Sequence, residues 1–589
     1  MDNNHLDQMR HSCAHLLAAT ILDLYPGTHN AIGPSIEHGF YQDFDFGDIK
    51  ISEEDFPKIE KRMKEILKTW SAFQTHEVNV DQALKDFAHN PYKCELIQEF
   101  AKEGKTLTEN NPGNFLDLCK GGHSENPQKE LQYFKLMSVA GAYWRGDEKN
   151  KMLTRIYGIC FPTKDELHTH LNMLEEAKKR DHRKIGKELG LFTFSELVGS
   201  GLPLFTPKGT MLRELLRIYS EDLRTAIGYE KVWIPHITKK ELYETSGHWA
   251  KFGDELFLVT SQETSDKMVL KPMNCPHHQQ IYAAEARSYR DLPLKYMETT
   301  TIYRDEKAGE LLGLSRVRSI TQDDSHTFCR PDQIEEIYNA LIEVVQTFYS
   351  KLGMKLKARL SYRDKNQPEK YLGDPALWDK AEAIILDIAK KNSLDYYEAE
   401  GEAAFYGPKI DFMAIDALGR EWQVATPQLD FVQPTRFGLK YTDNDGSEQT
   451  PVMIHFALMG SIERFLSVYI EHTAGNFPTW LAPIQVHFIP VSTDKHLDGA
   501  RAFVDEFKAQ GIRVSLDDAD ETVGKKIRNA SKMKIPYIVV VGDKEIGGQD
   551  SSADSEQRWM IRVRGEEERL QMTKDDFIEK IKKEIEEKL

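Results

Sequence analysis

The last hundred residues carry the strongest constraint on how this chain folds. After Pro483, Val/Ile-rich runs alternate with amphipathic runs, as "IQVHFIPV", "LDGARAFVDEFKAQG", "IRVSLDD", "VGKKIRNASKMK" and "PYIVVVGD". A strand–helix–strand–helix–strand order requires crossover connections, and these place parallel strands in one sheet. We therefore predict a small α/β domain with a mostly parallel sheet. The final run "TKDDFIEKIKKEIEEKL" predicts a docking helix whose apolar stripe consists of Phe577, Ile578, Ile581, Ile585 and Leu589.

The rest of the chain divides into three segments that differ in their residue types and in their predicted helices and strands. Mixed strands and helices follow an N-terminal helix, "NNHLDQMRHSCAHLLAATILDL", as far as residue 163. A polar run over residues 164–190 starts at a Thr cap and becomes basic, which predicts a linker helix; a solvated helix face explains it equally well. Strands rich in Val, Ile, Tyr and Trp then alternate with helices over residues 191–482. The chain is thus expected to be an α/β and α+β multidomain protein.

Composition excludes several classes of protein. The chain of 589 residues has room for three or four domains, and no apolar run approaches the roughly 20 residues of a membrane helix. The N-terminus is polar, unlike a signal or transit peptide, and the six cysteines form no CxxC pair, which suits a reducing cytoplasm. A net charge of −17 argues against indiscriminate nucleic-acid binding. These features indicate a cytoplasmic enzyme that has no membrane or DNA partner.

The stretch "TTIYRDEKAGELLGLSRVRSITQDDSHTFC" contains two polar strands joined by a Gly-bearing loop. The first strand delivers Arg304 and Glu306. Strand alternation puts Gln322, Asp324 and His326 on one face of the second strand. Such a hairpin can grip an anionic substrate, although a solvated antiparallel hairpin fits the same pattern.

Three further segments carry residues of chemical interest. "VMIHFALMGSIERF" begins as a strand and becomes a helix with Arg464 near its N-terminus, where an arginine can bind phosphate. "TMLRELLRIYSEDLRTAIGYEKVWIPHI" is a long helix that feeds a strand containing Pro235. "KPMNCPHHQQIY" places Cys275 beside two histidines. From these residues alone we expect Cys275 to be a buried structural thiol, and we expect His326 and His455 to be histidines of the protein core.

Two pairs of residues spaced four apart, one of two histidines and one of a cysteine and a histidine, stand out in the N-terminal segment. "HSCAH" places His11 and His15 on one helix face, and "DLCKGGHS" places Cys119 and His123 at the same interval of four. By residue type alone, this set could bind zinc.

Together these segments resemble the three motifs of the class II aminoacyl-tRNA synthetases. The stretches "KPMNCP", "GLSRVRSITQDDSHTFC", "GEAAFYGPKIDF", "QLDF", "VMIH" and "FPTWLAP" are more specific and are similar to those of the threonyl-tRNA synthetase family. The resemblance implies an editing domain over residues 1–163, an antiparallel-sheet catalytic domain over 191–482 and an anticodon-binding domain over 483–589. It also implies a homodimer formed through the Pro235 region, in a form without the family's N-terminal ubiquitin-like module.

The resemblance implies one Zn²⁺ per subunit on Cys275, His326 and His455, a ligand set that leaves an open position. Threonine and valine are near-isosteres that an apolar pocket separates poorly. A metal that binds both the amino group and the hydroxyl of threonine would reject valine. The residues implied around the amino acid are Asp324, which would hold the hydroxyl, and Gln322, Tyr406 and Gln428.

The implied reaction has two steps and uses ATP with Mg²⁺. The threonine carboxylate attacks the α-phosphate, and the threonyl group then passes to the terminal ribose of tRNA(Thr). Such chemistry needs positioning and charge neutralisation more than a protein nucleophile. The resemblance assigns Arg304 to the α-phosphate and carboxylate, and Glu306 to adenine. The outer phosphates are assigned to Arg316 and Arg464, with Lys409 and Gln423 nearby.

Serine lacks only one methyl group of threonine, which is worth about 1–3 kcal/mol of discrimination. A second, hydrolytic site is therefore expected. The resemblance implies a metal-free editing site that hydrolyses seryl-tRNA(Thr) and consists of His11, His15, Cys119 and His123, with Lys93 and Asp117 nearby. A zinc site and a purely structural cluster remain the alternatives.

Two residues depart from the family pattern, and two other functions remain open. Gly122 stands where "GPH" is usual, which should loosen that turn, and Phe456 follows His455 where an arginine is expected, which should remove a charge near the metal. Arg562 and Arg564 are candidate anticodon contacts. A stand-alone hydrolase of mischarged tRNA and an RNA-binding regulator built on a synthetase scaffold are the alternative functions.

Overall fold

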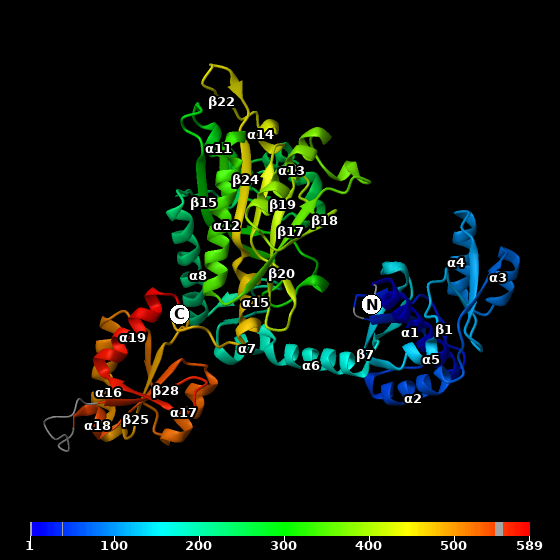
Figure 1. Cartoon of the computed structure of the whole chain (residues 1–589), viewed down its shortest axis with the longest axis horizontal. Coiled ribbons are helices and arrows are strands. Elements are labelled where there is room, and N and C mark those ends of the chain that lie inside the picture. Colours follow the sequence, from blue (N-terminus) through cyan, green and yellow to red (C-terminus); the bar gives the residue numbers. More distant parts are fainter. Residues whose placement is uncertain (1–2, 38, 548–557) are drawn as a thin grey trace. The chain divides into compact units, whose positions relative to one another are not determined.

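The computed structural model describes residues 3–37, 39–547 and 558–589. It divides into two compact units, Met1–Glu175 and Glu176–Leu589, which are coloured along the chain in Figure 1. Each unit has a hydrophobic core of its own. None of the helices in these described ranges is long and apolar enough to cross a membrane.

In the first unit, a long helix, α1 (Asn3–Leu24), packs on an antiparallel sheet. Its apolar residues recur every three or four positions, so Met9, Cys13 and Leu16 are buried on one face. The sheet has the order β1–β3–β8–β7, with β2 beside β3. Its strands are β1 (His29–Asn30), β2 (Ser35–Ile36), β3 (Gly39–Asp45), β7 (Tyr133–Tyr143) and β8 (Met152–Phe161).

A second, smaller sheet in this unit carries Asp117, and Cys119 follows its last strand directly. Its order is β4–β5–β6, and α2, α3 and α4 complete the unit. The elements are α2 (Phe56–Leu67), β4 (Gln74–Val78), α3 (Val80–Asp86), α4 (Pro91–Lys102), β5 (Leu107–Asn111) and β6 (Asp117–Leu118). This arrangement makes the unit α+β, as predicted.

The predicted linker helix is two helices in the structure, α6 (Lys164–Arg180) and α7 (His182–Leu189). Thr163 accepts a hydrogen bond from the backbone N–H of Glu166, as the predicted Thr cap should. The helix breaks at Asp181, whose carboxylate accepts from the backbone N–H of Arg183 and so caps α7. α6 has no buried residue, whereas α7 buries one face against the second unit.

The second unit is built on a mostly antiparallel sheet of nine described strands, in the order β11–β15–β16–β24–β21–β19–β17–β18 with β20 beside β19 (Figure 1). Only the β11–β15 and β17–β18 pairs of this sheet are parallel. The strands are β11 (Glu230–Lys231), β15 (Leu294–Tyr303), β16 (Ser319–Cys329), β17 (Lys355–Tyr362), β18 (Tyr396–Glu400), β19 (Lys409–Ile415), β20 (Glu421–Gln423), β21 (Thr426–Asp430) and β24 (Val452–Ser461).

Four long helices bury apolar faces against this sheet and form the largest core. They are α8 (Pro207–Ala226), α12 (Ile334–Lys351), α13 (Pro375–Lys391) and α15 (Ile462–Thr473). A three-stranded sheet and the helix α11 (Cys275–Ala283) lie in the segment between α8 and β15. The strands of that sheet are β12 (Ile237–Lys239), β13 (Leu258–Thr260) and β14 (Lys267–Leu270).

The pairing of β16 with β24 is interrupted once, and the interruption matters for the site. Gln322 faces Ser461 and Asp324 faces Ala457, so β24 contains two residues more than β16 over this interval. The Asp323 carboxylate accepts the backbone N–H groups of Met459 and Gly460 in the bulge. A buried acid thus satisfies two donors that the ladder leaves unpaired.

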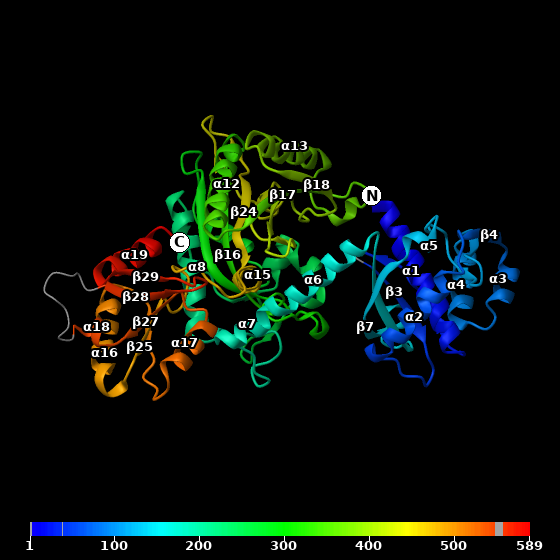
Figure 2. The ribbon, with the colours of Figure 1, turned by 60° about the horizontal axis from the view of Figure 1, so that its bottom comes forward.

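The C-terminal domain has the sheet order β26–β25–β27–β28–β29 (Figure 2). β25, β26 and β27 are parallel as predicted, but β28 and β29 add an antiparallel edge that the sequence pattern did not reveal. The elements are β25 (Val486–Pro490), α16 (Thr493–Ala509), β26 (Val514–Leu516), α17 (Val523–Lys532), β27 (Tyr537–Val541), β28 (Arg558–Val563), β29 (Arg569–Thr573) and α19 (Lys574–Glu586).

Two predictions for this domain need correction. The apolar stripe of α19 is buried at Phe577, Ile578 and Ile581, but Leu589 lies beyond the helix and is half exposed. Arg564 is not free to contact a base, because its guanidinium donates to the carbonyls of Lys534 and Phe477.

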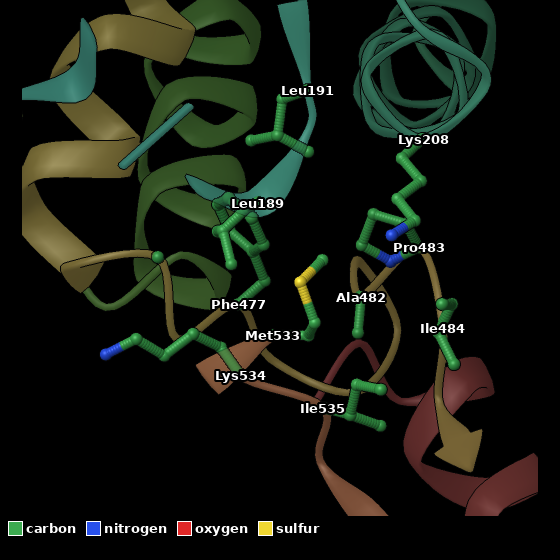
Figure 3. A pocket seen from close by; sticks show the side chains of 11 residues that line it. Leu189, Leu191, Lys208, Phe477, Ala482, Pro483, Ile484, Met533, Lys534 and Ile535 are labelled. Carbon is green, nitrogen blue, oxygen red and sulfur yellow. The ribbon is translucent and has the colours of Figure 1, made fainter. Parts of the chain in front are cut away.

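A small apolar cavity of about 30 Å³ lies where α7, the segment 477–484 and the segment 533–535 meet. Met533 lies among Leu189, Phe477 and Ala482 (Figure 3). Its lining is mainly apolar, with Lys208 and Lys534 as the charged residues among those described, and its volume suits a packing defect better than a ligand site.

Candidate functional site

A cavity of about 570 Å³ lies over the centre of the large sheet, beside β16, β21 and β24. Residues far apart in the sequence line it because these strands are neighbours in the sheet. The predicted site residues among them are Arg304, Glu306, Arg316, Gln322, Gln423, Gln428 and Arg464.

Two guanidinium groups in this cavity have no carboxylate partner among the described residues. Arg304 packs over the ring of Phe252 at 4.8 Å, and its Nε has no hydrogen-bond acceptor. Arg464 lies in the first turn of α15, and only its backbone makes hydrogen bonds. Burial lowers the pKa of the Arg304 guanidinium, and partial enclosure in the cavity lowers that of Arg464, whose side chain remains solvent-exposed. Unpaired cations facing one cavity favour an anionic ligand.

Glu306 and Arg316 form an ion pair on the other wall of the cavity. Nε of Arg316 donates to Oε2 of Glu306 over 2.8 Å, and its Nη2 also reaches Oε2 of Glu310 at 2.5 Å. Arg318 donates to the backbone carbonyl of Glu306 and so fixes this part of the loop. Arg316 is half exposed and can leave its partner for a ligand.

Lys409 and Gln423 are held by a residue that the sequence analysis missed, the buried Asp411. The Asp411 carboxylate accepts from Nζ of Lys409 at 2.9 Å and from Nε2 of Gln423 at 2.7 Å. It also accepts from Arg359, Ser361 and Thr426. Gln423 lines the cavity, whereas Lys409 does not.

Cys275, His326 and His455 come together in a buried cluster, with their candidate ligand atoms all within 4.8 Å of one another. Cys275 begins α11, while His326 on β16 and His455 on β24 are direct partners in the antiparallel ladder. Nε2 of His326 lies 3.1 Å from Nδ1 of His455. The sheet register therefore brings together residues that are distant in the sequence.

The groups around this cluster suit a divalent cation. Nε2 of His455 lies 2.9 Å from the Asp430 carboxylate, so this nitrogen carries the proton and leaves Nδ1 bare toward His326. A carboxylate behind a metal-binding histidine is a common supporting arrangement. Burial, followed by Asp324 and Asp430, raises the pKa of the Cys275 thiol well above its usual value. A bound cation would favour the thiolate instead, and one sulfur with two imidazoles fits Zn²⁺.

The residues predicted around the amino acid lie beside this cluster. The ring of Tyr406 stacks on that of His455, and its hydroxyl donates to Oε1 of Gln428 over 2.7 Å. Asn274, which was not predicted, donates to Asp324 at 3.0 Å and lies 3.4 Å from Oε1 of Gln322. Because one amide contacts both side chains, Gln322 and Asp324 share a face.

The side chains of the N-terminal cluster also lie close to one another. This cluster consists of His11, His15, Lys93, Asp117, Cys119 and His123. Nε2 of His11 lies 2.9 Å from Sγ of Cys119 and 3.3 Å from Nε2 of His15. Nε2 of His123 lies 3.6 Å from the same sulfur. Behind them, the buried Asp117 lies 3.0 Å from Nδ1 of His15 and 2.6 Å from Nζ of Lys93. All six predicted residues thus meet at one place.

The N-terminal cluster separates charge. Burial opposes ionisation of Cys119, but hydrogen bonds with His11, His123 and His15 lower its pKa to about 3. Burial likewise opposes charge on His15, but Asp117 and Cys119 raise its pKa to about 9. At neutral pH this is a thiolate beside an imidazolium, an arrangement that can orient and polarise a bound ester.

Comparison with known proteins gives matches along most of the chain. Family models match at residues 257–473 (tRNA synthetase class II core domain), 485–584 (anticodon binding domain) and 111–157 (threonyl and alanyl tRNA synthetase second additional domain). The threonine–tRNA ligase of Cytophaga hutchinsonii is 47% identical over 579 residues, which cover 98% of this chain and 88% of that protein. The chain belongs to the threonyl-tRNA synthetase family.

Other threonyl-tRNA synthetases support the assignment. The threonine–tRNA ligase of Staphylococcus carnosus is 46% identical over 574 residues, 97% of this chain and 87% of that protein. The crystal structure of the RNA binding domain of the threonyl-tRNA synthetase from Cryptosporidium parvum Iowa II aligns with a TM-score of 0.63 and 34% identity. That alignment covers 68% of this chain and 98% of the crystallised chain.

The two departures from the threonyl-tRNA synthetase pattern have structural explanations. Phe456 points away from the cluster of Cys275, His326 and His455, because it lies on the opposite face of β24, where it is fully buried in the core. The expectation that it alters the charge beside His455 is therefore wrong. Gly121 and Gly122 both have positive φ, of 96° and 83°. Proline cannot adopt such a φ, so this turn has a backbone that "GPH" would not allow.

Three supporting residues were not predicted from the sequence. Asp411, Asp430 and Asn274 lie inside the quoted stretches "GPKIDF", "QLDF" and "KPMNCP". The available signal was a polar residue within an otherwise apolar strand or next to a predicted ligand. Apart from Lys409, which lies two residues before Asp411 on β19, their side-chain partners are distant in the sequence, so no local pattern identifies what they hold.

Proposed function

We propose that the chain attaches L-threonine to tRNA(Thr) with ATP and hydrolyses mis-attached serine at its N-terminal cluster. The observation that most directly supports this is the cavity of about 570 Å³, which is lined by Arg304 and Arg464, two guanidinium groups without a carboxylate partner among the described residues. A triphosphate supplies the charge that these groups lack.

In the synthetic site, the chain's own residues bind, orient and neutralise. Arg304 would hold the α-phosphate and the threonine carboxylate, so that the carboxylate oxygen can attack phosphorus and displace diphosphate. Arg316 and Arg464 would take the outer phosphates, with Mg²⁺ accompanying ATP, and Glu306 would contact adenine. Gln423 and Lys409, both fixed by Asp411, would complete this wall. Positioning and charge account for such a reaction without a protein nucleophile.

Selection of the amino acid would rest on the buried cluster beside the cavity. Cys275, His326 and His455 would hold Zn²⁺, with Asp430 orienting His455. When bound, the metal would supply a Lewis-acid position that a hydroxyl can occupy and a methyl group cannot. Asp324 would accept the threonine hydroxyl, Gln428 and Tyr406 would line the amino-group side, and Gln322 would also lie beside the amino acid. Valine then loses a strong contact, and this discriminates better than shape alone.

Serine also has a hydroxyl group, so the synthetic site would accept it. The N-terminal cluster would then hydrolyse the resulting seryl-tRNA(Thr). His11, His15, Cys119 and His123 would surround the seryl ester, and Asp117 with Lys93 would keep His15 in place. We propose that this site works without a metal, because its donors are already satisfied by one another as a thiolate–imidazolium set.

The remaining features follow the same scheme. We propose the boundaries 1–163, 164–190, 191–482 and 483–589 for the editing domain, linker, catalytic domain and anticodon-binding domain. We also propose a cytoplasmic homodimer. Exposed apolar side chains on the outer face of α8, in the segment between β11 and β12 and at the start of β12 support a dimer; they are Met211, Ile218, Trp233 and Ile237.

Metal analysis combined with aminoacylation tests the proposal. The purified chain should contain one zinc per subunit, lose it in Cys275→Ala, and charge tRNA(Thr) with threonine but not valine. His15→Ala should accumulate seryl-tRNA(Thr) and keep its zinc. Two zinc ions per subunit would contradict a metal-free editing site. Absence of threonine-dependent ATP–diphosphate exchange would favour the stand-alone hydrolase.

A further inference from the structure

The loop between β15 and β16 ends in a tight turn that lies next to Arg316. Leu312 and Arg316 exchange two backbone hydrogen bonds, of 3.2 and 3.3 Å, and Leu314 between them is fully buried. Gly313 has a φ of 50°, and a Cβ at this position would lie 2.2 Å from Nε2 of His182. The turn therefore fits against the His182 ring only because position 313 has no side chain.

His182, the first residue of α7, connects this turn to α15. Its side chain is 3% exposed, with Nδ1 lying 2.8 Å from Oε1 of Glu471 and Nε2 lying 3.0 Å from the backbone nitrogen of Leu314. A backbone N–H can only donate, so Nε2 is the acceptor and Nδ1 carries the proton. Both ring nitrogens are therefore used, and the tautomer is set by these two partners.

One stripe of α15 faces both the turn and the cavity. Arg464, Ser467 and Glu471 are spaced so that they lie along one side of the helix. Arg464 lines the cavity, and the Ser467 hydroxyl lies 2.9 Å from that of Ser315 in the turn. Glu471 orients the histidine ring described above. The turn is thus attached to α15 at two points, and Arg316 follows immediately.

Neither end of this attachment is free to act as a metal site. Asp181, next to His182, is occupied by Arg183 and by the cap of α7. Glu471 also accepts from Arg420 at 2.6 Å and from the backbone N–H of His182 at 3.2 Å. The attachment therefore has a mechanical role, because its donors and acceptors are satisfied within the chain.

We propose that His182 is a positioning residue for amino-acid activation. By holding the Leu314 N–H on a ring oriented by Glu471, it fixes the turn so that Arg316 and Arg464 face the same bound triphosphate. His182 itself touches no substrate. This inference rests on the proposed role of the cavity as the ATP site.

A pair of substitutions separates the two contacts of the ring. His182→Asn keeps a donor near the Nδ1 position and loses the acceptor for Leu314. His182→Gln keeps an acceptor near the Nε2 position and loses the donor to Glu471. We expect His182→Asn to raise the KM for ATP about tenfold and the KM for threonine less than about twofold, because a buried N–H loses its partner. His182→Gln should recover most of the ATP affinity.

Amide hydrogen exchange of the full chain measures directly whether the Leu314 N–H is held by His182. The Leu314 amide should exchange faster in His182→Asn and recover its protection in His182→Gln, while His168→Asn on the exposed face of α6 should change nothing. If His182→Asn does not fold, Ser315→Ala loosens the other attachment point and should shift the KM for ATP in the same direction. ATP–diphosphate exchange and calorimetric ATP binding provide the affinities.

Equal effects of the two His182 variants, or an equal shift for threonine and ATP, would overturn the proposal. So would a deprotected Leu314 amide with unchanged ATP affinity. Failure of the proposed function has a different signature, since the unaltered chain would then show neither threonine-dependent exchange nor ATP binding.

Discussion

At the scale of single residues, the two sites depend on buried carboxylates that hold other side chains. Asp430 orients His455, Asp411 holds Lys409 and Gln423, and Asp117 supports His15. Each acid is buried because several donors compensate for the cost of removing its charge from water. Substitutions at these acids should therefore affect the sites without touching a substrate.

Asp430→Asn should weaken zinc binding about 10- to 100-fold, because a neutral amide orients and polarises His455 less than a carboxylate does. Competition between the full chain and a chromophoric chelator measures the affinity without any assay of catalysis. Asp445→Asn, in an exposed turn, is the matched control. Unchanged affinity in Asp430→Asn would mean that Asp430 serves only to accept the backbone N–H groups of Val432 and Gln433.

Cys119 should react as a thiolate over a wide pH range. With a pKa lowered to about 3, the group stays ionised above that pH, so its alkylation rate should be flat between about pH 5 and 8. An ordinary thiol, with a pKa of about 8.5, becomes about tenfold faster per unit over the same range. Mass spectrometry of the Cys119 peptide after iodoacetamide treatment gives the rate. In His11→Ala the flat profile should tilt upward; a tilt in the unaltered chain would contradict the charge-separated cluster.

At the scale of elements, pairing between strands decides which side chains meet. The β16–β24 register puts His326 opposite His455, and the β21–β24 register puts Gln428 opposite His455, so all three lie in one row across the sheet. The bulge at residues 458–460 lies further along β24, just before α15 begins at Ile462. Asp323 stabilises that bulge, with Ser220 of α8 as a further hydrogen-bond donor.

Asp323→Ala should loosen the end of β24 and lower the free energy of opening there by about 2–4 kcal/mol, because two buried N–H groups lose their acceptor. Ser220→Ala removes one hydroxyl and should cost about 1 kcal/mol. Native-state hydrogen exchange of the Met459 and Gly460 amides reports both effects locally. Equal protection of these amides in Asp323→Ala and the unaltered chain would show that the bulge is held by its packing alone.

At the scale of the whole molecule, the second unit leaves apolar surface exposed on one helix. α8 buries Leu212 and Leu216 in the core, yet Met211 and Ile218 on its other side are exposed. Trp233, close after it in the sequence, is 76% exposed. A helix that is apolar on two sides indicates a second packing partner, which agrees with the proposed dimer.

Trp233→Glu should convert the dimer to a monomer at micromolar concentration, because a charge would be buried in the contact without a partner. Sedimentation velocity measures the change. Leu377→Glu alters a 41% exposed residue on α13 and should leave the dimer intact. A dimer that survives Trp233→Glu would place the contact elsewhere.

The amino-acid sequence by itself determined the alternating order of the C-terminal domain, the shared face of His11 and His15, and, through its family motifs, which residues are candidates for the two proposed sites. These features are local, because helix and strand periodicity and turn residues act over a few positions. Only the tertiary structure decided that the linker breaks at Asp181, that Phe456 faces away from His455, and that Asp430, Asp411 and His182 contact His455, Lys409 and the backbone N–H of Leu314, respectively. Those outcomes depend on which strands and helices become neighbours, and burial of apolar surface across the whole chain selects that arrangement.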